Sequence, residues 1–245
     1  MKPIRSLLLS AGLGTRLRPL TLEKPKCLVE INKKPILEYW IDNLENIGIQ
    51  KVLINTHYLA EKVNDFLYQQ QRRDMKIYKT YEKILLGTAG TLIANHEFFI
   101  GSLGILIHAD NFTTDDLSAF ITNHYLRPKD CILTMLTFDT DNPSCCGIVQ
   151  KDKFGRVIRF YEKSKKDYGI CANGAIYAFD REFIEFVRGI SYEISDFSID
   201  ILPLMLGKIF SWHTLEVYLD IGNELSLKRA NKIAKCKPSR NLREI

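Results

Sequence analysis

Short apolar runs alternate with amphipathic segments through the first half of the chain, and this alternation limits the possible folds more than any other feature. The apolar runs are typical of buried strands and cover residues 4–9, 52–54, 75–81, 103–107 and 132–137. Apolar residues at helical spacing separate them at 35–47, 59–71 and 117–125, and a short helix is expected after Thr88. Strands that alternate with helices form mostly parallel sheets with helices on both faces. The sequence therefore predicts a mixed α/β fold, Rossmann-like, with a mostly parallel sheet.

The pattern changes from Gly147 onward. The segment "GIVQKDKFGRVIRFYEK" is typical of a hairpin that turns at residues 152–155. Beyond it we expect a strand at 172–179, helices at 180–187 and 197–206, strands at 209–213 and near 217, and a closing helix at 224–235. No linker or internal repeat interrupts this order. We therefore expect a single domain over residues 1–236, followed by a polar tail at 237–245.

The composition argues against nucleic-acid-binding and membrane proteins. The 245 residues include 34 Lys and Arg against 29 Asp and Glu, a net charge of +5, and they lack the dense basic stretches of charge-driven nucleic-acid binders. No stretch approaches the roughly 18 apolar residues of a membrane span, and the N-terminal apolar run has no small-residue cleavage site after it. The six cysteines form no Cys-x-x-Cys pair, which is typical of reduced thiols and disfavours zinc. We therefore expect a cytoplasmic protein without nucleic-acid or membrane partners; homo-oligomerisation is possible but not indicated.

The first apolar run leads into a loop that combines glycines with cations. Its glycines are Gly12 and Gly14, and its cations are Arg16, Arg18, Lys24 and Lys26. Glycine lets the backbone approach a phosphate closely, so that successive N–H groups can bind it. The pattern G-x-x-x-x-G-K-[ST] is absent, and the dinucleotide pattern G-x-G-x-x-G fails because Leu17 stands at its third glycine. The remaining interpretations are a loop that wraps a nucleoside triphosphate and a tight turn with solvated cations; the pattern favours the first.

The segment "SAGLGTRLRPLTLEKPKCL" around this loop resembles the signature of the sugar-1-phosphate nucleotidyltransferases. Further motifs of that family follow in order and at matching spacing: a nucleobase segment "LLGTAGTL" (85–92), a metal-aspartate segment "HADN" (108–111), sugar-site strands "CGIV" (146–149), "FYEK" (160–163) and "ANGAIYAF" (172–179), and a second metal-aspartate segment "YLDIGN" (218–223). The resemblance covers most of the chain. It implies the nucleotide-diphospho-sugar transferase fold.

The resemblance also implies a catalytic set of Arg16, Lys26 and Asp110. The family's reaction joins a sugar 1-phosphate to the α-phosphorus of a nucleoside triphosphate, so it needs positioning and cations more than covalent help. Arg16 would grip the β- and γ-phosphates, and Lys26 would neutralise charge near the α-phosphate. Asp110 and Asp220 offer hard oxygen ligands for Mg²⁺, the cofactor we expect. The alternatives are a helix cap or turn for Asp110 and a plain strand end for Asp220.

The residues expected to bind the substrates come from the loop, the base segment and the sugar strands: Ser10, Ala11, Gly12, Gly14, Thr15, Gly87, Thr88, Glu162, Lys163 and Asn173. Gly87 and Thr88 are candidates for reading the base edge. Glu162 would accept hydrogen bonds from sugar hydroxyls, and Lys163 would meet the sugar's phosphate. A Glu-Lys pair at a strand end is common in itself, and only its place in the series of motifs supports this role.

Three features depart from the family pattern or need a separate interpretation. Ser10 and Ala11 stand where many members have Gly-Gly or Ala-Gly. Ser164 follows Glu-Lys where Pro is usual, so the sugar-site loop is expected to be less rigid. Cys145 and Cys146 lie beside a sugar strand without an activating neighbour in the local sequence, and we expect them to be packing residues rather than nucleophiles.

The sequence as a whole predicts a Mg²⁺-dependent nucleotidyltransferase that makes a nucleoside diphosphate sugar from a nucleoside triphosphate and a sugar 1-phosphate. The segments "LLGTAGTL" and "HADN" resemble most the guanylyltransferases that use mannose 1-phosphate or heptose 1-phosphate, so GTP is the expected nucleotide. Uridylyl-, cytidylyl- and thymidylyltransferases share nearly the same motifs. A different class of function is a catalytically silent regulatory protein that binds sugar nucleotides, but the retained cations and aspartates disfavour it. The product would feed polysaccharide or glycoconjugate synthesis.

Overall fold

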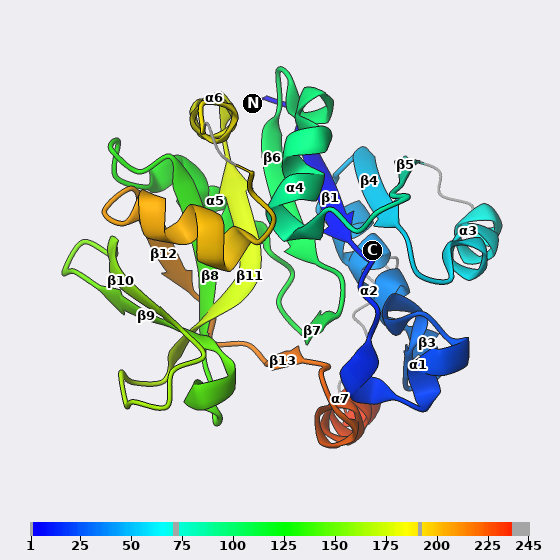
Figure 1. Cartoon of the computed structure of the whole chain (residues 1–245). Coiled ribbons are helices and arrows are strands. Elements are labelled where there is room, and N and C mark those ends of the chain that lie inside the picture. The colour runs from blue at the N-terminus through cyan, green and yellow to red at the C-terminus, as the bar shows by residue number, and fades with distance from the viewer. Residues whose placement is uncertain (1, 71–73, 191–192, 237–245) are drawn as a thin grey trace, which may run out of the picture. The chain divides into compact units, whose positions relative to one another are not determined.

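The computed structural model describes residues 2–70, 74–190 and 193–236, and the chain divides into two compact units (Figure 1). Unit 1 comprises Met1–Leu7, Leu86–Ile107 and Leu117–Leu215. Unit 2 comprises Leu8–Leu85, His108–Asp116 and Glu216–Ile245. Strand β1 (Ile4–Leu9) contributes its first residues to unit 1 and its last two to unit 2. None of the helices within the described ranges is long and apolar enough to cross a membrane.

Unit 1 is organised around the nine-residue strand β11. Its strands are β6 (Leu103–His108), β8 (Leu133–Asp139), β9 (Gly147–Lys151), β10 (Val157–Glu162), β11 (Cys171–Phe179) and β12 (Ile209–His213). β11 pairs antiparallel with β6, β8 and β9, β10 pairs antiparallel with β9, and β12 runs parallel to β8. The expected hairpin is therefore present as β9 and β10.

The helices of unit 1 cover an aromatic core. They are α4 (Gly87–Ala94), α5 (Ser118–Leu126) and α6 (Arg181–Arg188), with short turns η3 (His96–Phe99), η4 (Pro143–Cys145), η5 (Phe197–Ile201) and η6 (Leu202–Met205). The rings of Tyr177 and Phe197 stack with centroids 4.3 Å apart, and Phe183 lies 5.9 Å from Phe197. All three side chains are fully buried, so these aromatic rings pack β11, α6 and η5 against one another.

Unit 2 contains a parallel pair of strands, β4 (Lys51–Thr56) and β5 (Lys76–Tyr81), in register from Lys51 opposite Lys76. Its helices are α1 (Leu20–Glu23), α2 (Ile36–Asn46), α3 (Ala60–Gln69) and α7 (Glu224–Cys236), with turns η1 (Thr15–Leu17) and η2 (Lys26–Leu28). Helix α2 follows Pro35 and buries Ile36, Leu37, Trp40, Ile41 and Leu44, the face that helical spacing predicts. A helix N-terminal proline costs no hydrogen bond, which explains this start.

Two small ladders complete unit 2. β2 (Glu30–Ile31) pairs with β3 (Lys34–Pro35), and β7 (Asn111–Thr113) pairs antiparallel with β13 (Tyr218–Asp220). The second ladder joins segments more than 100 residues apart in the sequence.

The expected mixed α/β fold with a large, mostly parallel sheet is confirmed, and antiparallel pairs gather around β11. One local expectation needs correction. The helix expected at 197–206 is two short turns, η5 and η6, because Pro203 interrupts the run. Strand β7 was not expected, because its pairing partner is remote in sequence. The single domain over 1–236 stays a prediction, and the tail at 237–245 lies outside the described residues.

Candidate active site

The glycine loop is shaped by Gly14, whose backbone has a φ of 63°. A Cβ at this position would lie 3.0 Å from Thr21 and 3.1 Å from the Cβ of Lys26. A larger residue would therefore be strained both by its positive φ and by these close contacts. The carbonyl of Gly14 accepts hydrogen bonds from Leu17 N at 3.0 Å and from Thr21 Oγ1 at 2.7 Å. Gly12 has no atom within 4 Å of its potential Cβ position. The loop therefore turns tightly at Gly14 and is open at Gly12.

The other loop residues differ in exposure. Ser10 and Ala11 are buried, and the backbone N–H of Ser10 donates to Asn55 Oδ1 at 2.7 Å. Thr15 is exposed and begins the short turn that carries Arg16. The predicted loop thus has a buried, anchored start and an exposed end that presents its arginine.

Lys26 lies between two aspartates of unit 2. Its side chain is only 9% exposed, and its Nζ donates a short hydrogen bond to Asp110 Oδ2. Asp220 Oδ1 lies 3.6 Å from the same Nζ. Arg16 Nη2 lies 3.4 Å from Asp220 Oδ2, with the Arg16 side chain 65% exposed. The structure therefore brings together the four residues Arg16, Lys26, Asp110 and Asp220, which we call the Lys26 cluster.

The β7–β13 ladder explains why two aspartates 110 residues apart meet. Asp220 lies opposite Asn111 in this ladder, and Ile221 N donates to the carbonyl of Asp110 at 3.2 Å. The carbonyl of Asn111 in turn accepts a hydrogen bond from Trp40 Nε1 at 2.8 Å, which ties the ladder to helix α2. Backbone pairing, rather than side-chain attraction, therefore sets the spacing of the two carboxylates.

The charges of the Lys26 cluster depend on one another. Burial disfavours the charged form of Asp110, but the ammonium of Lys26 and the nearby His108 outweigh it and hold the pKa of Asp110 below its usual value. A Cβ at Gly222 would lie 2.9 Å from Arg16 Nη1, so the glycine of "YLDIGN" leaves room for the guanidinium. The cluster thus places two cations and two carboxylates at the end of the glycine loop.

The donor set of the Lys26 cluster fits a magnesium ion. Asp110 and Asp220 both direct an oxygen at the same ammonium group, so they converge on one cation position. Within the described ranges, no group of three or more His, Cys, Asp or Glu side chains forms a candidate metal site. Mg²⁺ is often held by one or two carboxylates together with substrate phosphates and water, so two aspartates meet its requirement.

In unit 1, Glu162, Lys163 and Asn173 lie on and beside strands β10 and β11. Lys163 Nζ pairs with Glu162 Oε1 at 3.1 Å, and Lys163 N donates to the carbonyl of Cys146 at 3.1 Å. A Cβ at Gly147 would lie 2.8 Å from Glu162 Oε2, so the glycine of "CGIV" allows the carboxylate to approach the strand.

Asn173 is held by an irregularity in strand β11. Its Nδ2 donates to Tyr177 Oη at 2.7 Å, and its Oδ1 accepts from Ala175 N at 2.9 Å. Ala175 has a φ of 53°, and the strand register shifts between Asn173 and Tyr177. Burial raises the pKa of Tyr177, and the carboxylate of Glu162 acts in the same direction, so the phenol remains a neutral hydrogen-bond partner.

The predicted base segment packs on a second segment of unit 1. Gly87 has a φ of 79°, and a Cβ there would lie 2.4 Å from the carbonyl oxygen of Ser195. Thr88 Oγ1 accepts a hydrogen bond from Phe197 N at 2.7 Å, and Ala89 N donates to Ser195 O at 2.8 Å. The Thr88 hydroxyl oxygen therefore has a structural contact of its own.

Sequence reasoning missed the contacts that hold the candidate residues. Asn55 anchors Ser10, Tyr177 holds Asn173, and Ser195 packs on Gly87. None of them belongs to a motif that the sequence singled out by chemistry, except that Tyr177 falls inside "ANGAIYAF". Their roles depend on contacts across strands or between distant segments, and such contacts leave no local pattern in the sequence.

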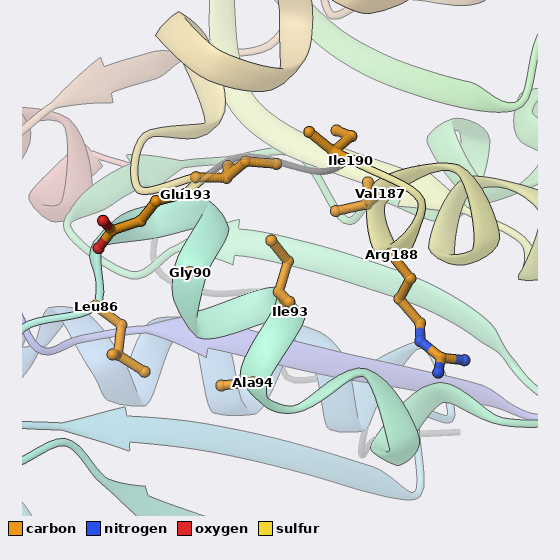
Figure 2. Close-up of a pocket in the computed structure, with 9 residues that line it drawn as sticks. Leu86, Gly90, Ile93, Ala94, Val187, Arg188, Ile190 and Glu193 are labelled. Carbon is orange, nitrogen blue, oxygen red and sulfur yellow. The ribbon is translucent and has the colours of Figure 1, made fainter.

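A cavity of about 310 Å³ in unit 1 contains none of the predicted site residues (Figure 2). Its lining is mostly aliphatic, with one arginine and one glutamate: Leu86, Gly90, Ile93, Ala94, Val187, Arg188, Ile190, Glu193 and Ile194. It adjoins helix α4, which begins at Gly87. Its lining offers one cation, and the Lys26 cluster is a better place for phosphate chemistry.

Comparisons with known proteins identify the family of the chain. The model of a family described as nucleotidyl transferase matches residues 5–235. The mannose-1-phosphate guanylyltransferase catalytic subunit beta of Danio rerio is 30% identical over 231 residues, which cover 89% of this chain and 61% of the relative. A UTP–glucose-1-phosphate uridylyltransferase of Synechocystis is 26% identical over 238 residues, which cover 89% of this chain and 60% of the relative.

Solved structures show the same fold. The crystal structure of HddC from Yersinia pseudotuberculosis matches with a TM-score of 0.79 and 26% identity, over 95% of this chain and 99% of HddC. The chain spans about three fifths of the length of the curated relatives it matches. The family match over residues 5–235 leads to one conclusion: the chain belongs to the nucleotidyl transferase family.

Proposed function

We propose that this protein condenses a nucleoside triphosphate with a sugar 1-phosphate and releases pyrophosphate. The observation that carries the proposal is the Lys26 cluster, in which a buried ammonium, an exposed guanidinium and two carboxylates lie at the end of the glycine loop. The alternative of a tight turn with solvated cations does not account for a lysine that is only 9% exposed between two aspartates. Lysine is rarely buried unless it is paired, and a paired one in a loop of this type suits phosphate binding.

The chemistry requires an oxygen of the sugar phosphate to attack the α-phosphorus while the bond to pyrophosphate breaks. Both reactants are anions, and negative charge grows on the leaving pyrophosphate. In this proposal the forked guanidinium of Arg16 binds the β- and γ-phosphates, and the ammonium of Lys26 neutralises the α-phosphate. Asp110 and Asp220 would hold Mg²⁺, which supplies further positive charge to the phosphates when bound. Glu162, Lys163 and Asn173 would bind the sugar 1-phosphate.

The preferred substrates in this proposal are GTP and mannose 1-phosphate or a manno-heptose 1-phosphate. The support is the likeness of "LLGTAGTL" and "HADN" to the guanylyltransferase branch, together with the name of the Danio rerio relative. The Synechocystis relative is a uridylyltransferase at similar identity, so UTP, CTP and dTTP belong in the test.

The test is a panel of GTP, UTP, CTP and dTTP against several hexose and heptose 1-phosphates, with Mg²⁺ present and pyrophosphate release as the readout. We expect release with one nucleotide preferred by at least about tenfold in kcat/KM, because one mispaired hydrogen-bonding edge costs about 1.4 kcal/mol or more. A protein that binds nucleotide sugar but releases no pyrophosphate with any pair would support the silent regulatory alternative. Release without a preference for GTP would contradict the choice of nucleotide but keep the activity.

A further inference from the structure

The start of the glycine loop is held by a buried hydrogen-bonded chain that the proposed reaction does not use. Ser10, the first residue after strand β1, is 6% exposed. Its backbone N–H donates to Asn55 Oδ1 at 2.7 Å, and its hydroxyl donates a short hydrogen bond to the carbonyl of Asn55. Asn55 Nδ2 donates to Glu82 Oε1 at 2.8 Å. We call Ser10, Asn55 and Glu82 the loop clamp; all three belong to unit 2.

The chemistry of the loop clamp fixes the orientation of the Asn55 amide. A carboxylate only accepts hydrogen bonds, so the NH₂ end of the amide must face Glu82. The carbonyl end then faces the N–H of Ser10, and the reversed amide would lose both bonds. Asn55 and Glu82 are 2% and 4% exposed, so water cannot replace a lost partner readily. Glu82 thus acts on the loop through Asn55.

Glu82 is itself fixed by the backbone at the ends of two parallel strands. Its N–H donates to the carbonyl of Thr56 at 2.9 Å, and its carbonyl contacts His57 Nδ1 at 2.8 Å. The chain of contacts therefore runs from the rigid end of β4 and β5 to the first residue of the loop. A loop anchored in this way loses less conformational entropy when it binds a ligand than a free one does.

The Ser10 hydroxyl adds a second bond to the clamp. Glycine or alanine at this position could keep the backbone bond to Asn55 but would lack the bond from the hydroxyl. Ser10 also has a hydrogen-bond contact with the thiol of Cys27. Burial raises the pKa of this thiol to about 12, and the contact with Ser10 acts in the opposite direction. Cys27 follows Lys26, so the clamp reaches the segment that carries the central ammonium of the Lys26 cluster.

We propose that Asn55 is a positioning residue for the nucleoside triphosphate: with Glu82 behind it and Ser10 in front, it holds the glycine loop in its binding conformation before the nucleotide arrives. The inference rests on the proposed function, because it assumes that the loop binds the triphosphate. Asn55 need not touch the nucleotide. Its effect falls on nucleotide affinity and not on the sugar 1-phosphate.

The test compares Asn55→Ala, Asn55→Asp and the double variant that combines Asn55→Asp with Glu82→Gln. Binding of each Mg²⁺–nucleoside triphosphate is measured by calorimetry, KM for the sugar 1-phosphate by pyrophosphate release, and folding by thermal unfolding. We expect Asn55→Ala to weaken binding of the preferred nucleotide by about tenfold, with the sugar KM within about twofold of wild type. Asn55→Asp places a carboxylate against Glu82 and should weaken binding further.

The double variant is the decisive arm. The amide introduced at position 82 can donate to the carboxylate introduced at position 55, whose other oxygen can accept from Ser10 N, so the clamp is rebuilt with its donor and acceptor exchanged. Nucleotide affinity should return to within about threefold of wild type. Asn43→Ala is the matched control, since Asn43 also lies in unit 2 and donates to a backbone carbonyl, that of Asp115, at 2.6 Å. It should lower the unfolding temperature without changing nucleotide affinity.

Unchanged affinity in folded Asn55→Ala, or a double variant no better than Asn55→Asp, would overturn the inference. Equal losses for nucleotide and sugar 1-phosphate would also overturn it, because a general loss of packing would then suffice. If wild-type protein binds a nucleotide but releases no pyrophosphate, the proposed function fails while the calorimetry still decides the role of Asn55. If wild-type protein binds none of the four nucleotides, both proposals fail.

Discussion

Two groups of carboxylates and cations in this chain use similar residue types but differ in charge balance. In unit 1, Asp180 accepts a hydrogen bond from Arg127 Nη2 at 2.8 Å and lies 3.4 Å from His124 Nε2 and 3.5 Å from Lys2 Nζ. One carboxylate is thus surrounded by donors. In the Lys26 cluster of unit 2, one buried ammonium lies between two carboxylates, and the second cation, Arg16, is 65% exposed.

The difference indicates that the contacts of Asp180 are structural, whereas the carboxylates of the Lys26 cluster can exchange a side-chain cation for a metal ion. The neighbouring imidazole of His124, together with the guanidinium of Arg127, holds the pKa of Asp180 well below its usual value, so this carboxylate needs no further cation. If Arg16 turns toward phosphate, Asp220 loses its Arg16 contact, and two carboxylates then share Lys26. Like charges at such a distance favour binding of a further cation. We therefore expect metal dependence in the Lys26 cluster and none around Asp180.

The largest effect is expected for Asp110→Asn and Asp220→Asn. Each should reduce kcat by roughly a thousandfold, about 4 kcal/mol, and raise the Mg²⁺ concentration needed for half-maximal activity, because each removes a charged oxygen ligand. The double variant should lose little more than the worse single variant, since both residues act through one ion. A Mg²⁺ titration of the initial rate measures this, with Asp180→Asn as the control carboxylate. Additive losses at an unchanged Mg²⁺ requirement would show that the two aspartates share no metal.

A smaller loss is expected for Arg16→Ala, more than about a hundredfold in kcat/KM or roughly 2.7 kcal/mol of transition-state stabilisation. The reason is the loss of a forked cation from the phosphates. Arg18→Ala is the matched control, because Arg18 is an exposed arginine in the same loop. Steady-state pyrophosphate release measures both. Near wild-type turnover of the Arg16 variant would remove this residue from the proposed mechanism.

The comparison also shows what the sequence could predict. The alternating runs indicated most strands and helices, because burial on one face leaves a local pattern, as in helix α2 after Pro35. The motifs identified Arg16, Lys26, Asp110 and Asp220 as a set, and the structure brings them together; their catalytic roles stay predictions. The reason for their meeting was not predictable, since the three-residue strands β7 and β13 have no periodicity and pair over more than 100 residues. The loop clamp was equally hidden, because Asn55 and Glu82 are ordinary residues at strand ends until the strands pair.

A stability effect without a catalytic effect is expected for Asp180→Asn. The variant should unfold with roughly 1 to 3 kcal/mol less free energy at pH 7, because Arg127 loses a charged partner in a part-buried position. The folded-state pKa of Asp180 is lowered, so its contribution is present above the unfolded value of about 3.9 and is lost as the pH falls through the folded value. Denaturant unfolding of wild type and variant from pH 7 to pH 3 measures this, and the two curves should begin to converge below about pH 4. A loss of turnover per folded molecule would place Asp180 in the site and erase the contrast.

The smallest effects are expected at Cys145 and Cys146, which directly precede strand β9 and lie outside both ion groups. Cys145 is exposed, and Cys146 Sγ lies 3.5 Å from Thr140 Oγ1, a contact that a serine hydroxyl can make as well. The bond from Lys163 N goes to the backbone carbonyl of Cys146, which substitution keeps. Cys145→Ser and Cys146→Ser should therefore each retain at least about half of the wild-type kcat/KM, a change of no more than about 0.4 kcal/mol. Pyrophosphate release with both substrates varied measures this, and circular dichroism confirms folding. If either variant folds but is inactive, a thiol takes part in the reaction. The cations and carboxylates of the Lys26 cluster would then not be sufficient to explain the proposed activity.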